Sequence, residues 1–208
     1  MRYLLIFSIV FLFFSSANAQ KTSYKVGLIG FYNLENLFDT INDPTINDEE
    51  FLPEGSYKYT GKVYLDKLSH LAQVISQIGT DISPDGLSLI GDAEIENETV
   101  LHDLVNQPLL KNRNYQFVHY NSPDLRGIDV CLIYNPKYFT PVWSQSLHVE
   151  LLNSDSTERF TRDVLFVYGK FDNEDMFVFV NHWPSRRGGE EVSAPSRAIA
   201  ARVCKNKI

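Results

Sequence analysis

Apolar and polar positions alternate along the chain in a way that predicts a mixed α/β domain. Short continuous apolar runs at 26–32, 87–90 and 176–180 are typical of strands that are covered on both faces. Residues 62–78 instead carry apolar side chains at three- and four-residue steps. This spacing predicts an amphipathic helix that ends at Gly79.

The remaining pattern adds further strands and two more helices. Strands are expected at 115–120, 126–134, 139–150 and 163–171, and helices at 98–110 and 193–204. Asn173-Glu174 leads from the last of these strands directly into the run at 176–180, which predicts an antiparallel hairpin. Helices placed among many strands favour mixed sheets covered by helices.

Composition places the chain among soluble globular proteins. It has 208 residues, of which 44% are hydrophobic and 22% charged, enough for one sizeable domain. The formal net charge is −7. Affinity for phosphate backbones comes from Lys and Arg, so we expect no stable nucleic-acid binding. We also expect the protein to be a monomer. A phosphate ester held in a local basic pocket remains compatible with this charge.

The first residues have the features of an export signal. Arg2 precedes an apolar stretch at 4–14, and residues 17–19 form a small-x-small cleavage pattern. We therefore expect residues 1–19 to be a signal peptide, with a signal anchor as the alternative. The apolar stretch is shorter than the roughly 20 residues that span a bilayer. The expected protein is periplasmic or secreted, with no membrane span after cleavage.

The two cysteines and the acidic loop at 40–61 have no predicted catalytic role. Cys131 lies in an apolar strand and Cys204 in a predicted helix, so free thiols are expected, with a disulfide as the alternative for an exported chain. The acidic loop at 40–61 lacks the alternating acids of a calcium-binding hand, which favours a solvated loop.

Polar residues follow three of the apolar strands. Asn33 follows the first, Glu94 the second, and Asn181-His182 the run at 176–180. Ligands of open α/β sheets bind at the carboxyl ends of strands. A buried Glu94 needs a cation or an arginine partner. The alternative for Asn33 is a turn residue, and for His182 a structural histidine with satisfied hydrogen bonds.

Basic residues and another acid complete the candidate set. Arg126 and Asp129 flank the start of a strand, and Arg186-Arg187 form a basic loop after Pro184. Asp129 is expected either to pair with Arg126 or to orient a catalytic group. Oxygen ligands suit magnesium, arginines suit phosphate oxygens, and a histidine can move a proton. Together these groups indicate metal-assisted phosphoester cleavage.

Four segments in this order resemble the endonuclease/exonuclease/phosphatase superfamily, and within it exported Bacteroidetes-type members. The segments are residues 31–39, 90–97, 126–130 and 181–186. The resemblance extends from about residue 25 to residue 208. It implies an α/β fold, namely a four-layer αββα sandwich of mixed and antiparallel sheets flanked by helices. It also implies a magnesium cofactor, with manganese or calcium as alternatives.

The resemblance assigns roles to individual residues. Asn33 and Glu94 match metal-site residues, and His182 matches the histidine near the scissile phosphate.

Four further residues take roles from the same motifs. Arg126 and Asp129 match a catalytic motif of this branch, and our hypothesis is that Asp129 orients His182 or Arg126. Asn181 and Arg186 are expected to bind phosphate.

The sequence departs from the family pattern in two ways. Asp92 stands where the family usually has an apolar residue, which is expected to disturb the strand before Glu94. Nothing after Arg187 matches the family's Gly-Asp-x-Asn and Ser-Asp-His motifs.

These departures shape the functional expectation. We expect residues 25–208 to form a partial domain, incomplete at the C-terminus. The predicted activity is that of a magnesium-dependent phosphoester hydrolase, weak or inactive in this chain. The alternative is a non-catalytic remnant with residual cation or phosphate binding. The class of phosphoester substrate is open.

Overall fold

The computed structural model describes residues 25–208, so the predicted signal peptide lies outside the described range. Seven strands form two sheets. Sheet A has the order β1-β2-β4-β3 and sheet B the order β5-β6-β7. The strands are β1 (Leu28–Leu37), β2 (Leu87–Ile95), β3 (Gln116–His119), β4 (Asp129–Tyr134), β5 (Phe139–Leu147), β6 (Val164–Phe171) and β7 (Glu174–Val180). The α-helices are α2 (Gly61–Gln77), α3 (Glu98–Val105) and α4 (Glu190–Lys207), with short 3₁₀ turns at Glu49–Phe51 and Lys111–Arg113.

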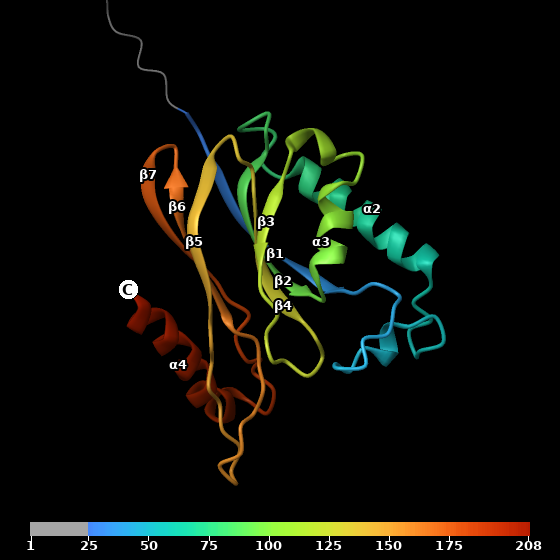
Figure 1. Cartoon of the computed structure of the whole chain (residues 1–208), viewed down its shortest axis with the longest axis vertical. Coiled ribbons are helices and arrows are strands. Elements are labelled where there is room, and N and C mark those ends of the chain that lie inside the picture. Colours follow the sequence, from blue (N-terminus) through green and yellow to red (C-terminus); the bar gives the residue numbers. More distant parts are fainter. Residues whose placement is uncertain (1–24) are drawn as a thin grey trace, which may run out of the picture.

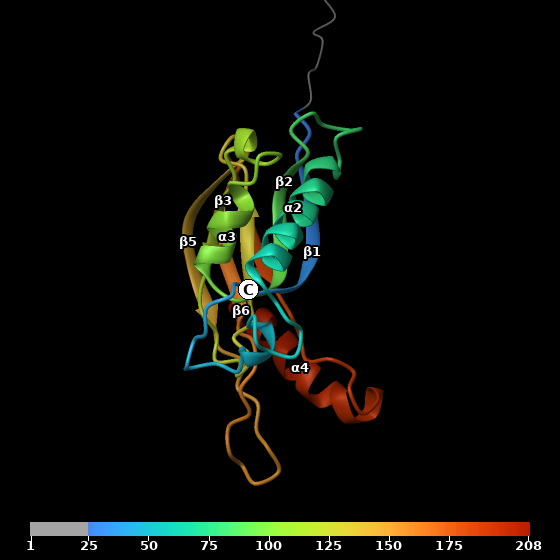
Figure 2. The ribbon, with the colours of Figure 1, turned by 90° about the vertical axis from the view of Figure 1, so that its right-hand side faces the viewer.

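The elements are stacked in four layers (Figure 1). Helices α2 and α3 cover one face of sheet A, sheet B packs on its other face, and α4 lies outside sheet B. Figure 2 shows α2 and α3 next to each other in front of the sheets. The predicted α/β sandwich of two sheets flanked by helices is therefore confirmed.

Sheet A is mixed and sheet B is antiparallel throughout. Strands β1 and β2 run parallel, and the other pairings in both sheets are antiparallel. Parallel neighbours need a long crossover, which α2 provides between β1 and β2. Because β1 and β2 are parallel, their carboxyl ends lie at the same end of sheet A.

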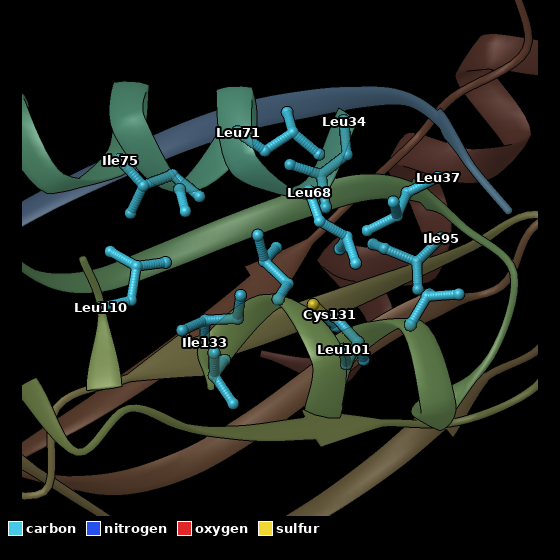
Figure 3. Close-up of a cluster of buried hydrophobic side chains, with 14 of the residues drawn as sticks. Leu34, Leu37, Leu68, Leu71, Ile75, Ile95, Leu101, Leu110, Cys131 and Ile133 are labelled. Atoms are coloured by element: carbon cyan, nitrogen blue, oxygen red, sulfur yellow. The ribbon is translucent and has the colours of Figure 1, made fainter. Parts of the chain in front are cut away.

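A first hydrophobic core fills the space between sheet A and its helices (Figure 3). Leu68 and Ile75 point from α2 onto the sheet, where they meet Leu34 and Ile133. All four are at most 1% exposed. Burial of such a side chain contributes about 1.5–3 kcal/mol each relative to exposure, so this cluster anchors α2 on the strands that carry the candidate site.

A second core joins the two sheets and brings β2 next to β7. Leu89 and Ala93 of sheet A and Val167 and Val180 of sheet B belong to this cluster. A Cβ added at Gly91 would come within 3.3 Å of a Val180 methyl group. The missing side chain at Gly91, in the middle of β2, thus allows the carboxyl end of β7 to approach β2 closely.

The predicted hairpin is confirmed. Strand β6 ends at Phe171 and β7 begins at Glu174, and the two pair antiparallel. Asp172 and Asn173, which form the loop, both have positive φ, +49° and +73°. A two-residue loop of this kind matches the twist of the strands that it joins.

Two expectations from the sequence need correction. Strand β2 is not disturbed at Asp92, which pairs with Tyr32 on one side and Cys131 on the other. The loop at 40–61 is not simply solvated, since Asp48 is 1% exposed. Phe51, from the 3₁₀ turn, stacks on Phe38 at 4.1 Å between ring centroids and pulls the loop onto the core.

Two smaller observations complete the fold. Cys131 and Cys204 are both free thiols, as expected. Within residues 25–208, no helix combines the length and the apolar character that crossing a membrane would require.

Candidate active site

Glu94 and His182, which lie 88 positions apart in the sequence, meet at the edge where the two sheets touch. His182 Nε2 lies 3.5 Å from Glu94 Oε1, and the two side chains are 22% and 17% exposed. Val180 belongs to the core between the sheets, with Val178 packed against it. His182 continues this every-second-residue pattern, so its ring faces sheet A.

A bulge in β2 aims Glu94 toward that ring. Glu94 has φ +65°, and its neighbours Ala93 and Ile95 are the last paired residues on either side of a register shift. Ala93 belongs to the core between the sheets but Ile95 to the core beneath the helices. The extra residue leaves Glu94 free of the regular alternation. Its Oε2 accepts a hydrogen bond from the Asn36 backbone N–H at 3.0 Å.

One ring nitrogen of His182 has no hydrogen-bond partner within residues 25–208, and the surroundings of the ring disfavour its charged form. Its Nδ1 is buried without a hydrogen-bond partner in the described part of the chain. Burial lowers the pKa of His182 below its usual value, and the positive charge of Arg162 lowers it further. Glu94 acts in the opposite direction but is outweighed. The catalytic role of His182 stays a prediction, and the neutral form that burial favours can accept a proton.

Arg162 holds the backbone that carries His182, a role that the sequence did not suggest. Its Nε and Nη2 donate to the His182 carbonyl at 3.1 and 2.9 Å, and Nη2 also donates to the Trp183 carbonyl at 3.1 Å. Its Nη1 pairs with Asp124 Oδ2 at 2.9 Å, and the two side chains are only 9% and 7% exposed. No local signal marks these partners, because 20 and 38 residues separate them from Arg162.

Asp129 does not have the partner that we expected. It is 2% exposed and accepts hydrogen bonds from the Ser122 N–H at 2.8 Å and the Ser122 hydroxyl at 2.6 Å. His119 Nε2 lies 3.1 Å from its other oxygen. The hypothesis that Asp129 orients His182 or Arg126 is therefore wrong. Its carboxylate is saturated by His119, a residue without a predicted role, and by the turn that precedes β4.

Arg126 lies at the rim of the site. Its Nε is 3.3 Å from Asp124 Oδ1, and its side chain is 55% exposed. After burial and Arg162, the positive charge of Arg126 also acts to lower the pKa of His182. Arg126 and Arg162 thus share the buried Asp124 carboxylate.

Asn181 and Arg186 point away from the Glu94–His182 pair. As the alternation of β7 requires, Asn181 faces α4, where its Oδ1 accepts from Trp183 Nε1 at 2.9 Å and from Cys204 Sγ at 3.2 Å. Arg186 pairs with Glu190 at 3.1 Å and is 74% exposed. The phosphate-binding role of both residues stays a prediction.

Asn33 lies beside Glu94 on the neighbouring strand. It pairs with Ala93 in the β1–β2 ladder, and its Oδ1 accepts from the Glu35 N–H at 2.7 Å. Residues 25–208 contain no group of three or more His, Cys, Asp or Glu side chains arranged to hold a metal ion. One carboxylate and one amide oxygen fit magnesium, which keeps several waters. They do not fit zinc, which takes at least three protein ligands.

Comparison with known proteins identifies the family of the chain. Residues 28–208 match the model of the endonuclease/exonuclease/phosphatase family. No curated protein matches the chain.

Solved structures from Bacteroides share the fold at low sequence identity. A family protein from Bacteroides vulgatus has a TM-score of 0.51 at 16% identity, with 86% of this chain and 58% of that chain covered. A family protein from Bacteroides thetaiotaomicron has a TM-score of 0.52 at 15% identity, with 86% and 56% covered. A mannosyl-6-phosphatase from Bacteroides thetaiotaomicron has a TM-score of 0.50 at 14% identity, with 88% and 58% covered.

The present chain thus spans a little over half the length of these structures. The family match covers most of the chain, and the layered fold agrees with it. The chain belongs to the endonuclease/exonuclease/phosphatase family.

Proposed function

We propose that this domain is a magnesium-dependent phosphoester hydrolase whose activity is weak in the 208-residue chain. The observation that carries the proposal is the contact between Glu94 and His182, whose pKa burial lowers, at the ends of strands from different sheets. A carboxylate beside an imidazole that can exchange a proton is the minimum that metal-assisted hydrolysis needs.

Each group in the site has a distinct task. Glu94 and Asn33 would hold magnesium, which when bound supplies positive charge to the phosphoryl oxygens. His182 Nε2, on the Glu94 side of the ring, moves a proton or stabilises developing charge on the substrate. Arg162 fixes the position of His182 through its backbone carbonyl. Arg126, at the rim, offers a guanidinium to the phosphate.

Weak turnover follows from how few groups the site contains. Within residues 25–208, His182 is the one imidazole in contact with Glu94. Loss of a positioned general acid or base typically slows a reaction by about 10²–10⁴-fold. The alternative is a non-catalytic chain that binds a cation or phosphate.

Hydrolysis of bis-p-nitrophenyl phosphate tests the proposal. The chain is expected to release p-nitrophenol slowly and only with magnesium present. His182→Ala and Glu94→Gln should each lower this rate by about tenfold or more. His148→Ala is the matched control, because His148 is exposed and pairs instead with Glu158 and Asp163.

Three outcomes would count against the proposal in different ways. A rate that is the same in both site variants and the control would mean that the activity does not come from this site. Rapid turnover that His182→Ala abolishes would contradict the weakness but not the site. No turnover, with manganese binding that Glu94→Gln removes, would support the non-catalytic alternative.

A further inference from the structure

A cavity lies beside the loop that carries His182. Its volume is about 310 Å³, within the size range of small-ligand sites. It is lined by Leu151, by residues 159–162, by Pro184, Ser185 and Arg187 of the loop after His182, and by the first turns of α4. Arg162 belongs to both places, because it lines the cavity and also donates to the His182 carbonyl.

The lining of this cavity is basic. It includes Arg159, Arg162 and Arg187, and none of its residues is an Asp or a Glu. Asp124 neutralises Arg162. Arg159 donates to the Ser196 hydroxyl at 2.6 Å, which carries no charge. Within residues 25–208, neither Arg159 nor Arg187 forms an ion pair with a carboxylate.

Other arginines nearby show that this is not the general pattern of the surface. Arg186 and Arg197 both pair with Glu190 at the start of α4, at 3.1 and 3.2 Å. Two uncompensated guanidinium groups facing one cavity are therefore a local feature in a chain whose net charge is −7. An anion bound in the cavity would be attracted by both groups.

The cavity also contains hydroxyl donors. Thr161, which is 4% exposed, lines it together with Ser185 and Ser196. Guanidinium and hydroxyl groups are the donors that proteins use most often for phosphate oxygens. The first turn of α4 adds backbone dipoles of the same sign.

We propose that this cavity binds a second phosphate group on the substrate, separate from the phosphate that is cleaved. The assignment of that group to a substrate rests on the hydrolase function proposed above, whereas the anion site itself does not. Arg159 and Arg187, which line the cavity, are the residues that bind it, whereas Arg186 is not part of the lining. The substrate class is then a phosphoester that carries an additional phosphate group.

Binding of inorganic phosphate tests the anion site without metal and without turnover. Isothermal titration calorimetry would compare the whole chain with Arg159→Gln/Arg187→Gln. Arg202→Gln/Lys205→Gln, which removes two positive charges from exposed side chains outside the cavity, is the matched control. We expect the affinity to fall about tenfold or more in the cavity variant and less than about twofold in the control.

Several results would overturn the anion site. These are no phosphate binding by the unmodified chain at millimolar concentration, equal losses in the two double variants, or loss of binding in His182→Ala. If the cavity variant has a lower melting temperature than the unmodified chain, its loss of binding could reflect destabilisation. Arg159→Lys/Arg187→Lys is then measured in its place. This variant keeps both charges but loses the planar donors, and it is expected to recover only part of the affinity.

A rate comparison tests whether the bound phosphate belongs to a substrate. For a diester that also carries a phosphate monoester, kcat/KM should fall about tenfold in the cavity variant. For bis-p-nitrophenyl phosphate it should stay unchanged. Equal effects on both substrates would refute the substrate role. If the unmodified chain turns over neither substrate, the hydrolase function fails, and the calorimetry still decides the anion site.

Discussion

Replacement of Arg162 with alanine is expected to lower the free energy of unfolding by about 3–5 kcal/mol. The change leaves the Asp124 carboxylate buried without its main cationic partner, and such a charge is costly in a low-dielectric interior. It also removes the donors to the His182 and Trp183 carbonyls. Urea unfolding followed by circular dichroism measures the loss.

Arg126→Ala is the matched control for this variant. Arg126 pairs with the same Asp124 carboxylate, but its side chain is 55% exposed, where an ion pair contributes less than about 1 kcal/mol. Equal losses in the two variants would show that Asp124 does not depend on Arg162. Arg162→Lys keeps the charge but cannot donate to Asp124 and to two carbonyls at once, so an intermediate loss is expected.

Replacement of Asp92 with valine is expected to raise the free energy of unfolding by about 1–3 kcal/mol at neutral pH. Asp92 is fully buried, and its Oδ1 has no hydrogen-bond partner among residues 25–208. Its other oxygen has only the Cys131 thiol nearby, at 3.9 Å. Valine is close to aspartate in size, so it removes the unsatisfied carboxyl without overfilling the core.

The same substitution should change how stability depends on pH. Burial raises the pKa of Asp92 well above its usual value, so the folded protein keeps this proton after the unfolded chain has lost it. The stability of the unmodified chain therefore falls as pH rises from about 4 toward the raised pKa, by up to about 1.4 kcal/mol per pH unit. Asp92→Val should lack this decline.

Unfolding measured between pH 4 and 8 checks the second prediction. The gain from Asp92→Val should be smallest near pH 4, where the carboxyl is protonated in both states, and should grow as pH rises. Asp81→Asn, at an exposed position, should give a profile parallel to that of the unmodified chain. A parallel profile for Asp92→Val, or a loss of stability at neutral pH, would contradict the prediction.

The sequence predicted most of the elements because hydrophobic periodicity reflects burial directly. The predicted helix at 62–78 is α2, at Gly61–Gln77, and the predicted hairpin is β6–β7. Each of the seven strands was expected, but some of their bounds were wrong, because buried residues are not always apolar. Strand β2 continues past residue 90 to Ile95 through Gly91 and Asp92, which are polar or small but buried by packing from other elements.

For the candidate site, the sequence by itself singled out Glu94 and His182. A polar residue at the end of an apolar strand is unusual enough to notice without a structure. The sequence could not assign partners to the buried charges. Asp129 lies with His119 instead of Arg126 or His182, and Arg162 with Asp124.

Only the tertiary structure decided which of these groups meet. Glu94 reaches His182 because a bulge turns it out of β2 and because Gly91 lets β7 pack closely on that strand. Local pattern determines whether a side chain is buried, since neighbours in the sequence share an element. The choice of partner depends on which strands of two separate sheets come to lie opposite each other, and that depends on packing across the whole domain.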